Sequence, residues 1–473
     1  MKIPRFLLPF LCLISLLCST SMGYAQSEEQ PVFYLIQPGD TLGSIAYNFD
    51  TSVEELMIAN NISDPNFISP GEKLIIPSLF GMSGVITPVI LNLGDSFNQN
   101  ADFHDVDLQA LIKLNKITSM SNIAAGTTIL VPIKENAITN SITTSYYSTR
   151  LTTLLEFAVK VDSNVEKIET NNCCASYVQI VGNQNLFVYD TNAEPQFVKP
   201  LIENIKVSLS PLPLAQGATA SLKISSPIPI SISGSINGTE LHFHTKNNMD
   251  FFALQGIHAM VEPGVSTLKL SVIMEDGTLL PFEQSILIQP GNFSTDPPLL
   301  VDPETIKQES TATEEMLIND LTSKYTEEQY WSGIFQSPAF YQDYTSMFGN
   351  RRTYNDDPNV SFHSGLDFGG GVTLPIVAPA DGKVVFSGFL SIRGNAIFID
   401  HGLGIYTGYF HQSLLMVSEG EYVTAGQKIG EVGNTGRVSN ATDYPGAGAH
   451  LHWEVWVNGV QVNPLDWLQQ IYP

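Results

Sequence analysis

The first third of the chain repeats one pattern of residues, and this repetition favours several small units over a single core. The segment 33–77 contains a Gly-Asp pair, then Asn60, then a Pro-Gly turn before a closing apolar run. A shift of 55 residues recovers the pair as Gly94-Asp95 and the asparagine as Asn115, and a shift of 112 gives a weaker copy over 144–190. A constant offset across many positions indicates an array of related units. We therefore expect a multidomain molecule.

The first copy has the pattern of a strand, two helices and a second strand, and the second copy repeats this skeleton in weaker form. In the first copy Gly39-Asp40-Thr41 is typical of a helix start, because an Asp or Thr side chain accepts hydrogen bonds from the first free amides. Leu42 and Ile45 follow at helical spacing. The unit resembles the LysM domain, a small α+β fold. The resemblance covers 32–78, a degenerate copy over 86–134 and the highly degenerate copy over 144–190.

The LysM resemblance implies binding of glycans that contain N-acetylglucosamine, chiefly peptidoglycan. Carried over residue by residue, it indicates glycan contacts at Gly39, Asp40, Thr41, Asn60 and Ile62. The second and third copies are either further sugar-binding units or scaffold only.

The charge balance argues against nucleic acids and anionic polymers as electrostatic partners. The chain has 22 basic and 47 acidic side chains and a formal net charge of −25. This excludes a basic nucleic-acid footprint and argues against electrostatic adhesion to an anionic polymer. Sugar binding must then depend on hydrogen bonds and apolar contacts.

The start of the chain predicts export. Lys2 and Arg5 precede the apolar run 6–17, and Ala25 offers a small residue for cleavage, so residues 1–25 are interpreted as a secretory signal peptide; an uncleaved anchor is the alternative. No later run approaches about 18 apolar residues, so no stable membrane insertion is expected after cleavage. We expect a secreted, extracellular protein associated with the cell wall. The adjacent Cys173 and Cys174 are interpreted as structural.

The middle of the chain changes to a period of two. Short β-branched runs separated by Gly, Pro and Asn predict an all-β, Ig-like sandwich over 198–292. His242 and His244 lie on one face of a strand, but no third ligand is evident beside them, so we interpret them as part of a polar edge. The Pro-, Thr- and Glu-rich segment 293–330 is predicted to be an acidic linker with one helix.

Histidines in the last third have the spacing of a metal site. A catalytic zinc needs about three protein ligands and one open position. His363-Ser-Gly-Leu-Asp367 offers a nitrogen and an oxygen ligand, and its glycines argue against a helix. His450-Leu-His452 lies in a strand-like alternation that directs both rings to one face. One ring can then bind a metal while the other reaches water or substrate.

Together the motifs FHSGLDFGG, GYFH and HLHWEV closely resemble the lysostaphin-type (LytM-like) zinc metallopeptidases over about 348–468. The resemblance implies a mainly antiparallel β domain, placed here at 331–473, with an open groove and one Zn²⁺ per chain. Carried over, His363, Asp367 and His452 are the zinc ligands, and His411 and His450 are the two catalytic histidines. Which of these two is the general base stays open.

Other residues near these motifs are interpreted separately. His401 is expected to be structural, and Arg351 or Arg352 either meets a substrate carboxylate or has a surface role. The segment 437–449 is longer than the family pattern, which affects substrate fit. No HExxH helix is present, so a thermolysin-like arrangement is excluded.

These features predict a secreted peptidoglycan hydrolase. It would be a zinc-dependent endopeptidase that cuts cross-links or stem peptides, tethered to glycan by its LysM repeats. The alternatives are a non-catalytic regulator of other wall hydrolases and a secreted proteinase that acts on proteins.

Overall fold

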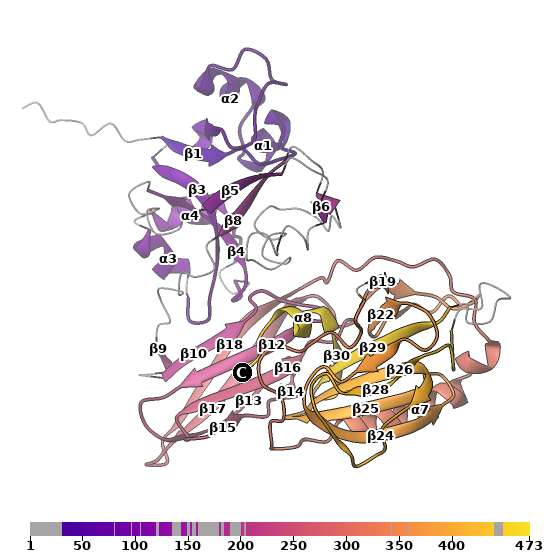
Figure 1. Ribbon diagram of the computed structural model, residues 1–473. Coiled ribbons are helices and arrows are strands. Elements are labelled where there is room, and N and C mark those ends of the chain that lie inside the picture. Colours follow the sequence, from indigo (N-terminus) through magenta and orange to yellow (C-terminus); the bar gives the residue numbers. More distant parts are fainter. Residues whose placement is uncertain are drawn as a thin grey trace, which may run out of the picture.

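Three packed domains and a connecting segment follow one another along the chain (Figure 1). The computed structural model describes residues 31–473, except 80, 96, 105, 120–122, 135–142, 149–151, 154–157, 159–178, 181–183, 190–199, 203–204, 342, 356 and 439–447. The predicted signal peptide, the cysteine pair and most of the segment 437–449 therefore lie outside the described residues.

The first two repeats share one sheet in the N-terminal domain. Its strand order is β2-β1-β3-β4, and β1 of the first copy pairs in parallel with β3 of the second. Two helices of each copy pack on this sheet, and both copies contribute to a single apolar core. The elements are β1 (Val32–Leu35), α1 (Leu42–Asn48), α2 (Val53–Asn60), β2 (Lys73–Ile75), β3 (Gly84–Ile90), α3 (Phe97–Phe103), α4 (Leu108–Leu114) and β4 (Thr128–Ile133).

The repeated asparagine has the same structural role in both copies. The Asn60 amide donates to the Ile75 carbonyl at 2.9 Å and accepts from the Ile75 amide at 2.7 Å. Asn115 makes the matching pair of bonds with Leu130, at 2.8 and 2.6 Å. Each asparagine side chain thus forms the two hydrogen bonds that a neighbouring strand would form. These bonds link the second helix of each copy to its closing strand.

The third repeat stays a prediction. Within 144–190 the structure describes only one isolated residue and the backbone of four short strands, which form two antiparallel pairs, β5 with β8 and β6 with β7. These strands are β5 (Thr143–Ser148), β6 (Thr152–Thr153), β7 (Gln179–Ile180) and β8 (Gln184–Tyr189).

The central domain consists of two five-stranded sheets, with orders β15-β16-β12-β10-β9 and β11-β18-β17-β13-β14. Leu222 of one sheet and Leu268 of the other belong to the same buried core, so the sheets pack face to face. This agrees with the predicted strand-rich domain, whereas its Ig-like character remains a prediction. The strands are β9 (Pro200–Ile202), β10 (Ile205–Ser210), β11 (Leu214–Ala215), β12 (Thr219–Ser225), β13 (Ile230–Ile236), β14 (Thr239–Glu240), β15 (His244–Thr245), β16 (Asp250–Gly256), β17 (Gly264–Met274) and β18 (Leu279–Gln289).

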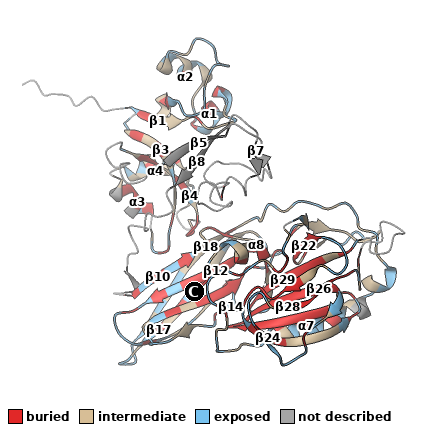
Figure 2. Ribbon diagram, viewed as in Figure 1, coloured by how far each residue is buried: buried red, intermediate tan, exposed pale blue. Residues whose placement is uncertain are grey.

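The C-terminal domain is mainly antiparallel β, as predicted. A sheet with the path β19-β22-β29-β26-β25-β24-β27 carries β23, β28 and β30 beside it. Figure 2 shows that its inner strands β26, β28 and β29 are largely buried. The elements are β19 (Tyr344–Ser346), β20 (Arg351–Arg352), β21 (Ser361–Phe362), β22 (Leu366–Gly369), β23 (Pro375–Val377), β24 (Gly382–Leu390), β25 (Gly394–Gly402), β26 (Ile405–Leu415), β27 (Tyr422–Val423), β28 (Lys428–Val432), β29 (His450–Val457), β30 (Val460–Val462) and α8 (Pro464–Gln469).

The connecting segment 293–330 lies along the C-terminal domain. It contains the short helix η4 (Pro303–Ile306) and α7 (Gln308–Thr322), which is the helix predicted for this acidic stretch. Ile318 of α7 is buried against aromatic side chains of β25 and β26, such as Phe398 and Phe410. The segment is therefore docked on the sheet along much of its length.

The central and C-terminal domains are packed against each other. The Trp467 indole donates to Thr219 Oγ1 at 3.1 Å, and the Asn458 amide donates to the Leu254 carbonyl at 2.7 Å. Leu254 of β16 is part of the core of the C-terminal domain. In the described part of the chain, no helix is both long and apolar enough to cross a membrane.

We predict that Gly256→Ala destabilises the junction of the two domains. A Cβ at position 256 would lie 2.7 Å from Val460 Cβ, closer than carbon atoms can pack. Overpacking of this kind costs about 1–3 kcal/mol, which chemical denaturation would measure. Gly371→Ala is the matched control, since a Cβ there meets nothing within 4 Å. Equal stability of the two variants would contradict the tight packing at Gly256.

Candidate metal centre and active site

Strand register brings two of the predicted ligands together. Asp367 of β22 and His452 of β29 are direct partners across an antiparallel pair. Their side chains therefore lie on one face and close together. His363, which follows β21, adds the third group, and all three residues are buried. Among the described residues, they are the one group of His, Cys, Asp and Glu side chains arranged to hold a metal.

Hydrogen bonds fix which ring nitrogen carries the proton in both predicted ligand histidines. His363 Nδ1 lies 2.8 Å from the Met347 carbonyl, which only accepts, so Nδ1 carries the proton and Nε2 presents a lone pair. His452 Nε2 lies 3.0 Å from a Glu454 carboxylate oxygen, which assigns the proton to Nε2 and leaves a lone pair on Nδ1.

The two lone pairs and a carboxylate oxygen converge on one point. His363 Nε2 is 2.9 Å from His452 Nδ1, and Asp367 Oδ1 lies 3.0 Å from the first and 2.6 Å from the second. Three electron-rich atoms at these distances repel one another unless a cation lies between them. Two nitrogens and one oxygen form a donor set that suits zinc, so these residues fit the metal that the sequence predicts.

In the metal-free chain a proton can act as this cation. Burial lowers the pKa of His452, but Asp367 and Glu454 outweigh it and raise the pKa overall. Burial also raises the pKa of Asp367, yet the neighbouring His363, His452 and His450 hold it well below its usual value. Protons and metal therefore compete for this site.

The two predicted catalytic histidines lie next to this group. The rings of His411 on β26 and His450 on β29 are 4.8 Å apart between centroids. Each has Nδ1 at 2.7 Å from a backbone carbonyl, that of Thr435 for His411 and that of Gly448 for His450. Both rings thus present Nε2, and His450 Nε2 lies 3.8 Å from Asp367 Oδ1.

His411 is held in an unusual backbone conformation. Its φ is +60°, in the left-handed region, which costs a non-glycine residue about 1–2 kcal/mol. Its amide donates to the Arg393 carbonyl at 2.9 Å. Burial, together with His450 and His452, lowers the pKa of His411 well below its usual value, so this ring is neutral and able to accept a proton.

Glu454 is a site residue that the sequence analysis missed. Burial raises its pKa, but Arg393 and His452 lower it, and the net value is about 2, so Glu454 is a carboxylate. Ser364 and Gln461 also donate to it, at 2.5 and 3.0 Å. The period of two that aligned His450 and His452 also predicts Glu454 on the same face, so the pattern contained the information.

The two arginines have inward contacts. Arg352 pairs with Asp296 at 2.8 Å and lies 3.6 Å from Asp367. Arg351 donates to the Ala259 carbonyl at 2.8 Å and so ties the C-terminal domain to the central one. Neither is an ordinary surface residue, and a contact of either with a substrate carboxylate remains a prediction.

Three histidines outside this group make contacts within the fold. His401 is fully buried, with Nδ1 at 2.7 Å from the Asp381 carbonyl and Nε2 at 2.8 Å from Thr407 Oγ1. This is the structural role expected for it. His242 stacks on Tyr325 of the connecting segment, and His244 packs on Phe252.

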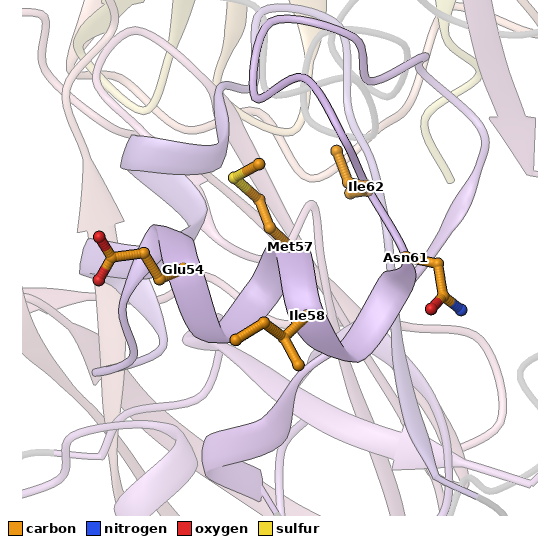
Figure 3. Close-up of a pocket in the computed structure, with 5 residues that line it drawn as sticks. All are labelled: Glu54, Met57, Ile58, Asn61 and Ile62. Carbon is orange, nitrogen blue, oxygen red and sulfur yellow. The ribbon is translucent and has the colours of Figure 1, made fainter.

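A pocket on the first repeat includes one of the predicted glycan contacts (Figure 3). Ile62 lines it, together with four side chains of α2 and its C-terminal end, namely Glu54, Met57, Ile58 and Asn61. Three of the other predicted residues make contacts inside the repeat. Thr41 caps α1, Asp40 accepts from Tyr34 and Gln37, and Asn60 bonds β2. Gly39 has a φ of +92° at the turn before Asp40. Their contact with sugar stays a prediction.

Comparison with known proteins assigns the domains. Residues 361–464 match peptidase family M23, and residues 34–77 and 92–132 match the LysM domain. The chain therefore carries two LysM domains and a C-terminal M23 peptidase domain, which confirms both resemblances.

Three curated relatives are similar to parts of the chain. Peptidoglycan DD-endopeptidase ShyC of Vibrio cholerae has 34% sequence identity in a match that covers 34% of this chain and 35% of the relative's chain. DD-carboxypeptidase/endopeptidase Mpg of Neisseria meningitidis is 37% identical over 28% of this chain and 29% of its own. Murein hydrolase activator NlpD of Salmonella dublin is 38% identical over 23% of this chain and 26% of its own. The chain thus spans about a third or less of the length of these relatives.

We predict that protonation of His401 destabilises the fold in acid. Burial lowers the pKa of His401 from 6.5 to about 4. As the pH falls, the unfolded chain binds a proton at this histidine at a higher pH than the folded chain does. The folded state therefore has its full stability above about pH 6.5 and loses stability as the pH falls towards 4. The loss amounts to about 3 kcal/mol. Denaturant unfolding between pH 7.5 and 4 should show it.

His401→Gln should flatten this part of the pH profile, whereas the same change at exposed His242 should leave it as in the unaltered chain. An equally steep profile in His401→Gln would show that other groups cause the acid sensitivity.

Proposed function

We propose that this protein is a secreted, zinc-dependent peptidoglycan endopeptidase that acts at the cell wall. The observation that carries the proposal is the convergence of two histidine lone pairs and the Asp367 carboxylate, beside two further histidines that each present Nε2. The M23 match and the DD-endopeptidase relatives support the same reaction class.

His363, Asp367 and His452 would hold the zinc ion. When bound, zinc polarises a carbonyl and makes a water acidic near neutral pH. His411 and His450 each present Nε2 with the Nδ1 proton fixed on a carbonyl. Either ring can take the proton of the attacking water and return one to the leaving amine. Burial of His411 keeps its ring neutral before the reaction, as a proton acceptor requires.

The LysM domains would concentrate the enzyme on its substrate. Linked binding modules raise the local concentration of substrate without new contacts at the reacting bond. The pocket beside Ile62 supplies apolar contacts, in keeping with the acidic chain. Peptidoglycan is thus the proposed partner for both ends of the molecule.

Cleavage of purified sacculi tests the activity. The unaltered chain should release new amino groups from sacculi. A chelator or His452→Ala should lower the rate at least about 100-fold, since loss of a ligand exceeds the usual effect of its supporting residues. His242→Ala, at an exposed histidine of the central domain, should retain full activity.

Two other outcomes would replace the proposal. Cleavage of a protein substrate but not of sacculi would make the chain a secreted proteinase. No cleavage of either with zinc restored would favour a regulator of other hydrolases, the class suggested by the similarity to the activator NlpD.

We predict that Ile58→Glu weakens the attachment to sacculi. Ile58 is 78% exposed and lines the pocket, so a charge there replaces an apolar sugar contact without disturbing the core. Loss of one such contact should reduce binding about tenfold in a sedimentation assay. Leu279→Glu makes the same kind of change on the exposed tip of the central domain and should bind normally. Equal binding of both variants would exclude this pocket.

A further inference from the structure

A buried carboxylate from outside the matched peptidase region is connected to the active site through one turn. Glu314 lies on α7, before residues 361–464, and is only 5% exposed. It accepts from the Ile392 amide at 2.8 Å, from the Arg393 amide at 3.3 Å and from the Arg393 guanidinium at 3.0 Å. Its neighbour Glu315 is exposed. A single carboxylate of the helix therefore holds both the backbone and the side chain of the turn between β24 and β25.

The side chain of this turn leads to a ligand ring. The second terminal nitrogen of Arg393 lies 3.6 Å from Glu454 Oε1, which in turn bonds His452 Nε2 at 3.0 Å. The Arg393 guanidinium also lies over the Phe410 ring, and that ring stacks on His452 with 5.6 Å between centroids. Arg393 is thus shared between the carboxylate of α7 and the carboxylate that orients His452.

The backbone of the same turn leads to a catalytic ring. The Arg393 carbonyl accepts from the His411 amide at 2.9 Å, and the Ile392 carbonyl accepts from the Arg437 amide at 2.7 Å. His411 needs this support because its φ of +60° is unfavourable. Two connections therefore run from Glu314 through Arg393, one by its side chain to His452 and one by its backbone to His411.

We propose that α7 is a positioning element of the active site, in which Glu314 sets His452 through Arg393 and Glu454 and sets His411 through the Arg393 backbone. The inference rests on the proposed function for its identification of the metal as zinc. Without the Glu314 charge, Arg393 is drawn to Glu454 alone, and Glu454 becomes a weaker acceptor for His452. The ring is then a poorer ligand, because partners behind a ligating histidine set its basicity and orientation.

The alternative is that Glu314 only anchors the helix to the sheet. In that case its loss lowers stability and leaves the metal site as it was. Binding measurements on the full chain distinguish the two roles without any substrate.

Glu314→Gln is the main variant, because it keeps the shape and an accepting oxygen and removes the charge. Its zinc affinity, measured by competition with a chromophoric chelator, should fall about tenfold, and the absorption spectrum of the Co²⁺-loaded chain should shift. Glu315→Gln, one residue along the same helix, should change neither. Thermal unfolding of the metal-free chains records stability separately.

A double-mutant cycle tests the path. In a Glu454→Gln background the further change Glu314→Gln should have little additional effect on zinc affinity, since the link to His452 is already broken. Arg393→Lys keeps the charge but cannot bridge both carboxylates, so it should show the same loss of zinc affinity. This variant replaces Glu314→Gln in the test if Glu314→Gln does not fold.

The outcomes are separable. Lower stability of Glu314→Gln with unchanged zinc affinity and spectrum would overturn the inference, even if the unaltered chain cleaves sacculi. Weakened zinc binding in a chain that cleaves no sacculi would support the inference and refute the proposed function. An unaltered chain that binds no zinc would refute both.

Discussion

The antiparallel pairing of β22 with β29 is the interaction on which the site depends. It sets Asp367 opposite His452 and, through the period of two along β29, places His450 and Glu454 on the same face. A shift of one residue in this register would turn all of these side chains to the opposite side of the sheet. The buried residues between them, such as Leu451 and Trp453, fix the register because they must enter the core.

The remaining parts of the molecule support this pair of strands from outside. The connecting segment binds the C-terminal domain through Asp296 with Arg352 and Glu314 with Arg393. The central domain adds the contact of Thr219 with the indole of Trp467. The predicted linker and the central domain are therefore structural supports of the C-terminal domain, and their loss would expose apolar surface.

Arginine is scarce in this acidic chain, and most of it lies in the C-terminal domain. Four of the six arginines of the sequence belong to the C-terminal domain, at positions 351, 352, 393 and 437. Two of them pair with carboxylates that also contact ligand histidines, as Arg352 does with Asp367 and Arg393 with Glu454. Guanidinium groups suit this task because they remain charged and bridge two acceptors at once.

The sequence by itself determined the LysM and peptidase domains, and it predicted the three ligands and the two catalytic histidines that the structure brings together, because these depend on local spacing and on motifs with few alternatives. It also showed that an asparagine recurs at a fixed position of the repeat, although not that Asn60 and Asn115 bond their own closing strands. Only the tertiary structure decided that the two LysM domains share a sheet and that Glu314 of an acidic helix meets Arg393. The physical reason is that burial of a charge depends on partners far away in the chain, and no local pattern on α7 specifies the turn that receives it.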